Sequence, residues 1–341
     1  MAFHIFDSIN NNKTYVIAEM SANHGGSLDH ALELVHAAKN VGADCLKIQT
    51  YTADTITINS HRPEFKVEDG LWKDMYLYDL YQKAYTPWDW QTTIKAECDK
   101  VGIDFLSTPF DPTAVDFLEK IGCEAYKIAS YELVDIPLIE YTAKLMKPMI
   151  MSTGMASIEE IQEAIDACRR VGNDRIVLLK CCSEYPTNWQ DMHLADIPDM
   201  VQKFRIPVGL SDHSAGSIAS VVGVSLGACV VEKHIMLEDV KSEDSGFSMT
   251  INEFGDMVKA VRSTKKIIGN VYYGPTATED INCRRSIYAV KNIHKGEKFT
   301  QKNARSIRPA NGLKPKYYSQ LLNTVAKRDI EAGEPITEED L

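Results

Sequence analysis

The chain has 341 residues, 44% of them apolar and 25% charged, a composition typical of globular proteins that argues against extensive disorder. Its 37 basic and 48 acidic side chains give a net charge of −11, which disfavours a nucleic-acid-binding protein but not a cleft that holds a small anion with a few lysines. The length suits a barrel of about 250 residues followed by a small second domain.

No apolar run is long enough to cross a bilayer, and residues 1–20 lack the basic, apolar and small-residue order of a secretory signal. The eight cysteines are scattered without a CxxC pair, which argues against a zinc knuckle and a disulfide framework. We therefore expect a soluble cytoplasmic protein with reduced cysteines.

Eight short apolar runs alternate with segments of helical periodicity along most of the chain. This alternation is typical of parallel βα units, and eight units in about 260 residues predict a (β/α)8 TIM barrel. Amphipathic patterns predict helices over 28–42 and 250–269, and Ser157 and Gly172 mark the ends of another. The predicted strands cover residues 15–19, 44–49, 103–108, 125–130, 148–153, 175–181, 207–212 and 229–234.

Two further segments do not fit the barrel repeat. Residues 50–85 are too rich in Tyr and Trp for a linker, and we expect a loop near the active site. Beyond Pro275 the pattern changes, and residues 293–303 resemble residues 330–340 at an offset of 37, each with a Gly-Glu turn and a Thr suited to capping a short helix. The sequence thus predicts a barrel domain over 1–275 and a small, turn-rich α+β domain over 283–341.

Polar side chains stand where the predicted strands end, the position of active-site residues in such barrels. Lys47 and Lys127 among Ser and Thr hydroxyls suit a substrate with a phosphate and a carboxylate, because a lysine inside a barrel needs an anion. Taken alone, Ser130 or Ser152 is better explained as a helix cap. The other polar strand ends are Glu19, Gln49, Ser107, Thr108, Thr153, Ser183, Ser211, Asp212, Glu232 and Lys233.

His213 and His234 end neighbouring predicted strands, which lie about 4.8 Å apart, so the two imidazoles can share one metal ion. Imidazole and oxygen ligands favour Mn²⁺, with Mg²⁺, Co²⁺ or Fe²⁺ as alternatives. His24 follows the first strand and could orient Glu19 or a substrate hydroxyl. Glu19 itself is open to three roles: proton carrier, anchor of a ligand, or partner of a lysine.

The adjacent Cys181 and Cys182 are a possible nucleophilic pair. No Cys–His activation pair is evident near them in the sequence, so we expect small buried residues at a strand end.

Nine segments of the chain form a recognisable series: IAEMSANHGGSL (17–28), LKIQTYT (46–52), STPFDPTAVDFLE (107–119), AYKIAS (125–130), STGMAS (152–157), YPT (185–187), GLSDHS (209–214), EKH (232–234) and RPANG (308–312). In their order and spacing, these segments resemble the sialic acid synthase family over nearly the whole chain. The family condenses phosphoenolpyruvate with an open-chain N-acetylated amino sugar and releases phosphate.

The resemblance implies a role for each matching residue. His213 and His234 would ligate a divalent metal and, with Glu19 managing protons, would be the catalytic group. Gln49, Tyr185 and Asp244 would contact substrate, Asp244 from the loop after the last strand. Ser183 stands where neuraminate synthases have Asn, so at this position the sequence departs from the family pattern. The residues implied to hold phosphoenolpyruvate are Lys47, Thr108, Lys127, Ser130, Ser152, Ser183 and Ser211.

The C-terminal segment resembles the antifreeze-like (SAF) domain. In this family that domain is exchanged across a homodimer and covers the partner's active site. Arg308 would then reach the sugar bound by the other protomer, whereas without the resemblance a salt bridge between domains explains it equally well.

Within the family, EMSANH, KIQTYT and residues 71–90, which are rich in Trp and Tyr, resemble one branch. That branch uses 2,4-diacetamido-2,4,6-trideoxy-L-altrose to make pseudaminic acid. N-acetylneuraminate or legionaminate synthesis is the nearest alternative, and a 3-deoxy-aldulosonate synthase is another. A non-catalytic carbohydrate- or ice-binding protein built around 283–341 is the alternative from a different class, and it would leave the polar strand ends unexplained.

Overall fold

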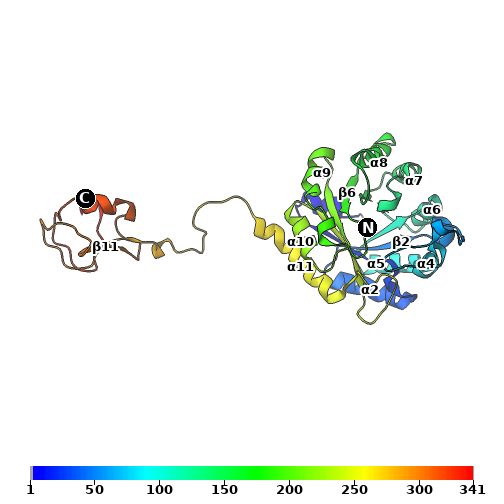
Figure 1. Cartoon of the computed structure of the whole chain (residues 1–341), viewed down its shortest axis with the longest axis horizontal. Coiled ribbons are helices and arrows are strands. Elements are labelled where there is room, and N and C mark those ends of the chain that lie inside the picture. Colours follow the sequence, from blue (N-terminus) through cyan, green and yellow to red (C-terminus); the bar gives the residue numbers. More distant parts are fainter. Residues whose placement is uncertain (1–2, 341) are drawn as a thin grey trace. The chain divides into compact units, whose positions relative to one another are not determined.

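The computed structural model describes residues 3–340, which divide into two compact units between Gly269 and Asn270. In the first unit, eight parallel strands pair in chain order, and β1 also pairs with β8, which closes the sheet. Helices surround the strands (Figure 1). The predicted TIM barrel is therefore confirmed, while the predicted domain limits, 1–275 and 283–341, stay predictions.

The barrel strands are β1 (Tyr15–Glu19), β2 (Cys45–Thr50), β3 (Asp104–Pro109), β4 (Tyr126–Ile128), β5 (Met149–Ser152), β6 (Ile176–Cys181), β7 (Val208–Asp212) and β8 (Val230–Met236), with a short β9 (Met249–Thr250) beside β8. The helices of this unit are α1 (Ile5–Asn10), α2 (Leu28–Asn40), α3 (Ala53–Ile56), α4 (Leu77–Ala84), α5 (Trp88–Val101), α6 (Pro112–Lys120), α7 (Ile136–Ala143), α8 (Ile158–Arg170), α9 (Asp196–Phe204), α10 (Ile218–Ser225) and α11 (Ile251–Ile268). Every predicted strand overlaps an observed one. No helix of residues 3–340 is both long and apolar enough to span a membrane.

Helix ends follow the side-chain chemistry expected from the sequence. Ser157 caps α8 by accepting a hydrogen bond from the Glu160 amide at 3.2 Å, and the Glu160 carboxylate bonds back to the Ser157 amide at 2.7 Å. Gly172 follows α8 with φ +90°, a conformation that favours glycine. The predicted helices over 28–42, 157–172 and 250–269 correspond to α2, α8 and α11.

The barrel interior is apolar at its amino-terminal half. Residues two apart on a strand share one face, and the inward positions nearest the strand starts are buried hydrophobic side chains. Helix α1 adds Ile5 to this cluster and contacts β1, so it covers the amino-terminal end. The strand members of the cluster are Tyr15, Ile17, Cys45, Leu106, Ile150, Val177, Leu179 and Val230, and Ala125 directly precedes β4.

The aromatic segment 50–85 contains α3 and α4 and is tied to the barrel by tryptophan side chains. Trp72 Nε1 donates a hydrogen bond to the carbonyl of Glu243, in the loop after β8, at 3.0 Å. Trp88 Nε1 donates to the Tyr51 carbonyl at 3.0 Å. The segment is thereby held at the carboxyl ends of the strands, as the sequence predicts.

The second unit has its own core around an antiparallel pair, β10 (Ser286–Ala289) and β11 (Ala304–Ile307), with a short α-helix, α12 (Tyr318–Leu321), and short 3-10 turns. Its internal repeat is visible in the backbone. Ile293 and Ile330, which correspond in the two copies, exchange N–H···O hydrogen bonds of 2.9 Å in both directions. The repeat therefore builds the unit by pairing its two copies.

Candidate active site

The inward-facing residues change from apolar to polar at the carboxyl-terminal half of the barrel. On β8, for example, buried Val230 is followed on the same face by Glu232 and His234. Every predicted site residue on a barrel strand or its following loop is buried or half-buried. Buried are Glu19, Lys47, Thr108, Lys127, Ser130, Ser152, Ser211, His213, His234 and Asp244, and half-buried are Gln49, Ser183 and Tyr185.

Four buried charged groups meet inside the barrel. Lys47 Nζ lies 2.6 Å from Glu19 Oε2 and 3.5 Å from Glu232 Oε1, and Lys127 Nζ lies 4.0 Å from the same Glu232 oxygen. Ser211 Oγ donates to that oxygen at 3.3 Å. Burial opposes ionisation of Glu232, but Lys127 and Lys47 lower its pKa on balance. The cluster therefore holds two ammonium groups in place with two carboxylates.

The predicted hydroxyl partners contact these ammonium groups. Lys127 Nζ donates to Ser152 Oγ at 2.6 Å, and Lys47 Nζ donates to Thr108 Oγ1 at 3.4 Å. These atoms come from four consecutive strands, β2 to β5, so the closed barrel brings them to one point. Ammonium and hydroxyl groups in this arrangement can bind the oxygens of a phosphate or a carboxylate.

Two more predicted hydroxyls converge on Gly154, just after β5. The Gly154 amide donates to Ser130 Oγ at 3.1 Å. A Cβ atom at this glycine would lie 2.3 Å from Ser183 Oγ and 2.8 Å from Ser130 Oγ, closer than any side chain tolerates. Glycine here is what allows the hydroxyls after β4 and β6 to approach each other.

The rings of His213 and His234 lie 5.4 Å apart, centroid to centroid. His213 Nδ1 is 3.1 Å from the Cys182 carbonyl, which requires the hydrogen on Nδ1 and leaves Nε2 free as a ligand. Burial, with the nearby lysines, holds the pKa of His234 well below its usual range, so that imidazole stays neutral. Its buried Nδ1 has no hydrogen-bond partner.

These features fit a divalent cation bound by the two imidazoles. Within residues 3–340, no group of three or more His, Cys, Asp or Glu side chains has an arrangement suited to a metal ion. A metal held by His213 and His234 would therefore have two protein ligands. Its remaining coordination positions would be taken by water and substrate oxygens.

Aromatic side chains pack against one side of the histidine pair. The Tyr185 ring lies 4.4 Å from His213, and the Phe247 ring lies 4.8 Å from His234 and 5.0 Å from Tyr185. Trp72, from the aromatic segment, lies 5.8 Å from Tyr185. We refer to Trp72, Tyr185 and Phe247 as the aromatic wall. It gives the site an apolar surface beside the two imidazoles.

A polar chain links the remaining substrate candidates. Gln49 Nε2 donates to Glu19 Oε1 at 3.1 Å and to Ser21 Oγ at 2.9 Å. The Ala22 amide donates to Asp244 Oδ2 at 3.3 Å. Burial raises the pKa of both Glu19 and Asp244. Gln49, Glu19 and Asp244 thus lie together, around the loop after β1.

Three site residues were not singled out from the sequence as catalytic or substrate-binding. Glu232 is recognisable from its alternation with His234, which places both on the inner face. Glu132 follows Ser130 in a 3-10 turn, and burial raises the pKa of its carboxyl to about 7, although Lys127 opposes this. Its Oε2 is buried without a hydrogen-bond partner. Neither Glu132 nor Phe247 carries a sequence signal that would have identified it.

The expectation that no Cys–His pair lies near Cys181 is wrong. β6 and β7 end side by side, which brings Cys181 Sγ to 3.8 Å from His213 Nδ1. Cys181 is buried, as expected, but Cys182 is half-buried. Arg308 is exposed and belongs to the second unit, directly after β11.

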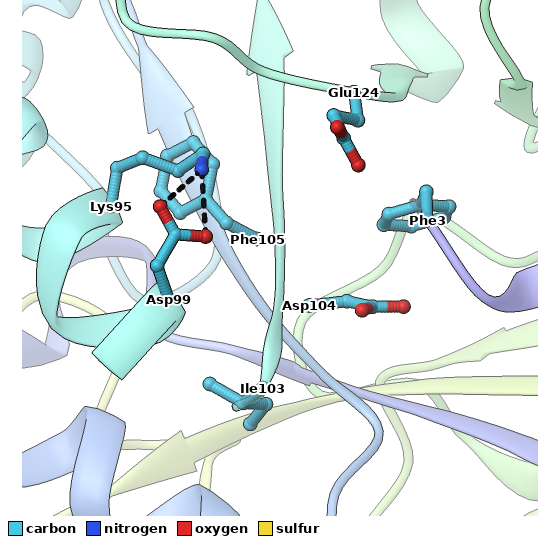
Figure 2. Close-up of a pocket in the computed structure, with 7 residues that line it drawn as sticks. All are labelled: Phe3, Lys95, Asp99, Ile103, Asp104, Phe105 and Glu124. Atoms are coloured by element: carbon cyan, nitrogen blue, oxygen red, sulfur yellow. Dashed lines mark hydrogen bonds and ion pairs between the residues drawn. The ribbon is translucent and has the colours of Figure 1, made fainter. Parts of the chain in front are cut away.

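A small pocket opens at the other end of the barrel (Figure 2). Figure 2 shows Lys95 paired with Asp99 there, with Nζ 2.7 Å from Oδ2. The pocket surrounds the start of β3, whereas catalytic groups of such barrels lie at the strand ends. We therefore assign it no part in the site. Its lining residues are Phe3, Lys95, Asp99, Ile103, Asp104, Phe105 and Glu124.

Comparison with known proteins gives matches over nearly the whole chain. Residues 34–273 match the NeuB family and residues 284–341 match the SAF domain. The chain is 44% identical to a pseudaminic acid synthase of Campylobacter jejuni (strain 81-176), over 96% of both chains. It is 39% identical to a pseudaminic acid synthase of Helicobacter pylori (strain 26695), over 96% of this chain and 97% of the other.

Among solved structures, the fold resembles that of an N-acetylneuraminic acid synthetase from Leptospira borgpetersenii crystallised with citrate. The TM-score is 0.70 at 30% sequence identity, covering 79% of this chain and 89% of that one. The resemblance predicted from the motifs is confirmed for both parts of the chain.

Proposed function

Because the chain belongs to the NeuB family, we propose that this enzyme is a pseudaminic acid synthase. It would condense phosphoenolpyruvate with 2,4-diacetamido-2,4,6-trideoxy-L-altrose and release phosphate. The identities of 44% and 39% to two pseudaminic acid synthases, against 30% to an N-acetylneuraminic acid synthetase, support this branch. The observation that carries the chemistry is the buried pair of lysines beside two histidines at the carboxyl ends of the strands.

Phosphoenolpyruvate would bind at the lysine cluster. Lys47 and Lys127 would neutralise its charge, while Thr108, Ser152 and Ser211 orient its oxygens. Ser130 and Ser183, together at Gly154, would complete the site on the β4 and β6 side. In the reaction, C3 of phosphoenolpyruvate attacks the sugar aldehyde, water adds at C2, and the tetrahedral intermediate expels phosphate by C–O cleavage.

His213 and His234 would hold a divalent cation, Mn²⁺ or else Mg²⁺, Co²⁺ or Fe²⁺. When bound, that cation supplies Lewis-acid polarisation. The protein contributes the neutral state of His234 and the hydrogen bond that fixes the tautomer of His213. The cation's identity follows from availability as much as from these ligands.

Two carboxyl groups are suited to proton transfer. Glu19 is buried beside Lys47, and burial raises its pKa. Glu132, with a pKa of about 7, can hold or release a proton near neutral pH. We assign proton management at the sugar to Glu19 and a proton reservoir near Lys127 to Glu132.

The sugar would lie between the histidines and the aromatic wall. A 6-deoxy sugar with two acetamido groups exposes methyl groups, which the rings of Trp72, Tyr185 and Phe247 can cover. Gln49 and Asp244 would bind its hydroxyl or amide groups. In a homodimer with exchanged C-terminal domains, Arg308 of one protomer would reach the sugar held by the other.

The proposal is tested by phosphate release from phosphoenolpyruvate in the presence of Mn²⁺, with EDTA and a His213→Ala/His234→Ala variant as controls. Three sugars are compared: the L-altro diacetamido sugar, its stereoisomer from legionaminate synthesis, and N-acetylmannosamine. We expect metal-dependent turnover chiefly with the L-altro sugar and a product mass matching pseudaminic acid.

Preference for another sugar would keep the mechanism and overturn the pseudaminate branch. Sugar binding that survives in the double variant, with no phosphate release from any sugar, would instead favour the carbohydrate-binding alternative.

A further inference from the structure

A second ion pair lies behind the two histidines, on the outer face of the same strands. Asp212 and Lys233 are register partners at the last paired position of β7 and β8. Lys233 Nζ lies 3.1 Å from Asp212 Oδ2, and both side chains are 0% exposed. Because successive strand residues alternate between faces, this pair points away from the barrel interior while His234, the next residue of β8, points inward. His213, directly after β7, lies on the same side as His234, with the two rings 5.4 Å apart.

The lysine also holds the main chain on both sides of His213. Lys233 Nζ donates to the Ser214 carbonyl at 2.6 Å and to the Asp212 carbonyl at 3.4 Å. These carbonyls belong to the residues directly before and after the histidine. Strand β7 ends at Asp212, so the β7–β8 ladder itself does not extend to His213. The Lys233 ammonium group thus bonds to the main chain where the backbone hydrogen bonds between β7 and β8 have ended.

The aspartate completes this arrangement from the other direction. Asp212 Oδ1 accepts hydrogen bonds from the Ser214 amide at 2.9 Å and from Ser214 Oγ at 2.7 Å, so its side chain bridges across His213. Its Oδ2 accepts from Ser220 Oγ of α10 at 2.6 Å. Both carboxylate oxygens are thus satisfied, and the turn that carries His213 is fixed to the helix behind it.

Burying a lysine and an aspartate is an expensive way to stabilise a fold. A buried ion pair often contributes no more than well-packed apolar side chains of the same volume. This pair does something that apolar residues could not, because an ammonium group has three N–H donors, enough to bond to two carbonyls and a carboxylate at once. Its geometry therefore points to a role in placing the turn at His213.

We propose that Lys233 and Asp212 are positioning residues that set His213 relative to His234, so that one divalent cation can be bound by both imidazoles. Lys233 directly precedes His234 in the chain and donates hydrogen bonds to the carbonyls on both sides of His213. Lys233 therefore connects the two histidines. The inference rests on the proposed function in one respect, namely that these histidines hold the metal.

The test measures metal binding directly. Mn²⁺ is titrated into the full-length protein, and free Mn²⁺ is followed by electron paramagnetic resonance. Lys233→Met removes the ammonium group while keeping an apolar stem of similar length. We expect its Mn²⁺ dissociation constant to rise by about tenfold or more, the size of effect seen when partners of metal ligands are removed. Excess Mn²⁺ should recover much of the lost turnover, because the chemical groups remain.

Lys180→Met is the matched control. Lys180 is also a lysine of a barrel strand, β6, and it pairs with a helix carboxylate, Asp196 of α9. Its ammonium group bonds to that carboxylate and not to the main chain beside a histidine. This variant should bind Mn²⁺ as the wild type does, and thermal unfolding of each variant separates lost stability from lost metal affinity.

Equal Mn²⁺ affinity in wild type and folded Lys233→Met, whatever the change in melting temperature, would overturn the inference and leave the proposed metal site intact. No Mn²⁺ binding by the wild type would overturn the metal site itself and the inference with it. If Lys233→Met does not fold, Ser220→Ala serves instead: it removes one hydrogen bond to Asp212 and should weaken Mn²⁺ binding about threefold, and unchanged binding there would count against the role.

Discussion

The imidazole of His24 lies buried after β1, where its Nδ1 accepts a hydrogen bond from the Gly26 amide at 3.0 Å. Its Nε2 is buried without a partner, and the ring meets Trp90 edge-on at 5.6 Å. Burial lowers the pKa of His24 to about 4 from an ordinary 6.5. The folded state therefore favours the neutral imidazole, and protonation of His24 is linked to unfolding.

This linkage predicts loss of stability in acid. The pKa of His24 is lower in the folded state than in the unfolded state. The free energy of unfolding is therefore undiminished by this group above pH 6.5 and falls as the pH decreases toward 4. The loss from this one group approaches about 3 kcal/mol. His24→Asn keeps an acceptor for the Gly26 amide but cannot be protonated, so its free energy of unfolding should fall less between pH 7.5 and 4.5. Urea unfolding of both proteins at the two pH values measures the difference, and identical falls would contradict it.

Individual site residues were predictable where their chemistry and their strand position agreed. Lys47 and Lys127 are lysines at the ends of apolar strands, a pattern that favours an anion site, and the structure places both in one cluster. Phe247 was not predictable, because a single aromatic residue in a loop says nothing about its neighbours. Cys181 was misjudged, since its approach to His213 depends on which strand ends lie side by side in space.

At the scale of elements, the turn after β5 controls how closely two hydroxyls approach. Gly154→Ala would place a methyl group 2.3 Å from Ser183 Oγ, so one or both serines must move. Such overpacking costs about 1–3 kcal/mol. If the serines hold phosphoenolpyruvate, its KM should rise by up to roughly five- to 150-fold, the factor that this energy corresponds to.

Steady-state kinetics with each substrate varied in turn measures the effect, and the KM for the sugar should change less. Gly255→Ala, in α11, is the control, because its methyl group would meet only the Val41 side chain. An unchanged KM for phosphoenolpyruvate in Gly154→Ala would remove these hydroxyls from the substrate site.

The turns of the second unit show what a repeat predicts and what it leaves out. The offset between its two copies was evident from the sequence, and Thr300 and Thr337 do occupy equivalent places. Thr300 Oγ1 accepts a hydrogen bond from the Lys302 amide at 3.3 Å, as expected of a cap. The amides of both threonines also donate to side chains of the turn, to Asn303 at 2.7 Å and to Asp340 at 2.9 Å. The sequence pattern marks the turn but does not tell which side chain accepts.

At the scale of the whole molecule, the proposed exchange of C-terminal domains makes a clear prediction. If Arg308 acts on the sugar of the partner subunit, each complete site needs His213 from one chain and Arg308 from another. Arg308→Ala and His213→Ala homodimers should both be inactive or nearly so. Co-refolded mixtures should regain activity, up to about a quarter of the wild-type value, because half of the dimers are mixed and each has one intact site.

Phosphate release from such mixtures measures the recovery, with each variant refolded alone as the control. Mixtures no more active than their parents, in a preparation shown to contain mixed dimers, would contradict an exchanged site.

The overall architecture was largely predictable because it depends on repeated patterns. Eight apolar runs separated by amphipathic helices determine a barrel, and barrel geometry then places all strand ends at one face. Side-chain contacts were not predictable in the same way. The pairing of Lys233 with the carbonyls around His213 depends on the register between β7 and β8, which single-sequence periodicity does not give.

The charge cluster inside the barrel also bears on how a substrate arrives. Lys47 and Lys127 are already matched by Glu19 and Glu232, so the cluster adds little to the field outside the barrel, where a net charge of −11 dominates. A multiply charged anion is therefore repelled at long range and gains attraction only after it has entered and competed with the internal carboxylates. Capture of phosphoenolpyruvate would then depend on diffusion and ionic screening, and its selectivity on short-range contacts rather than on electrostatic steering.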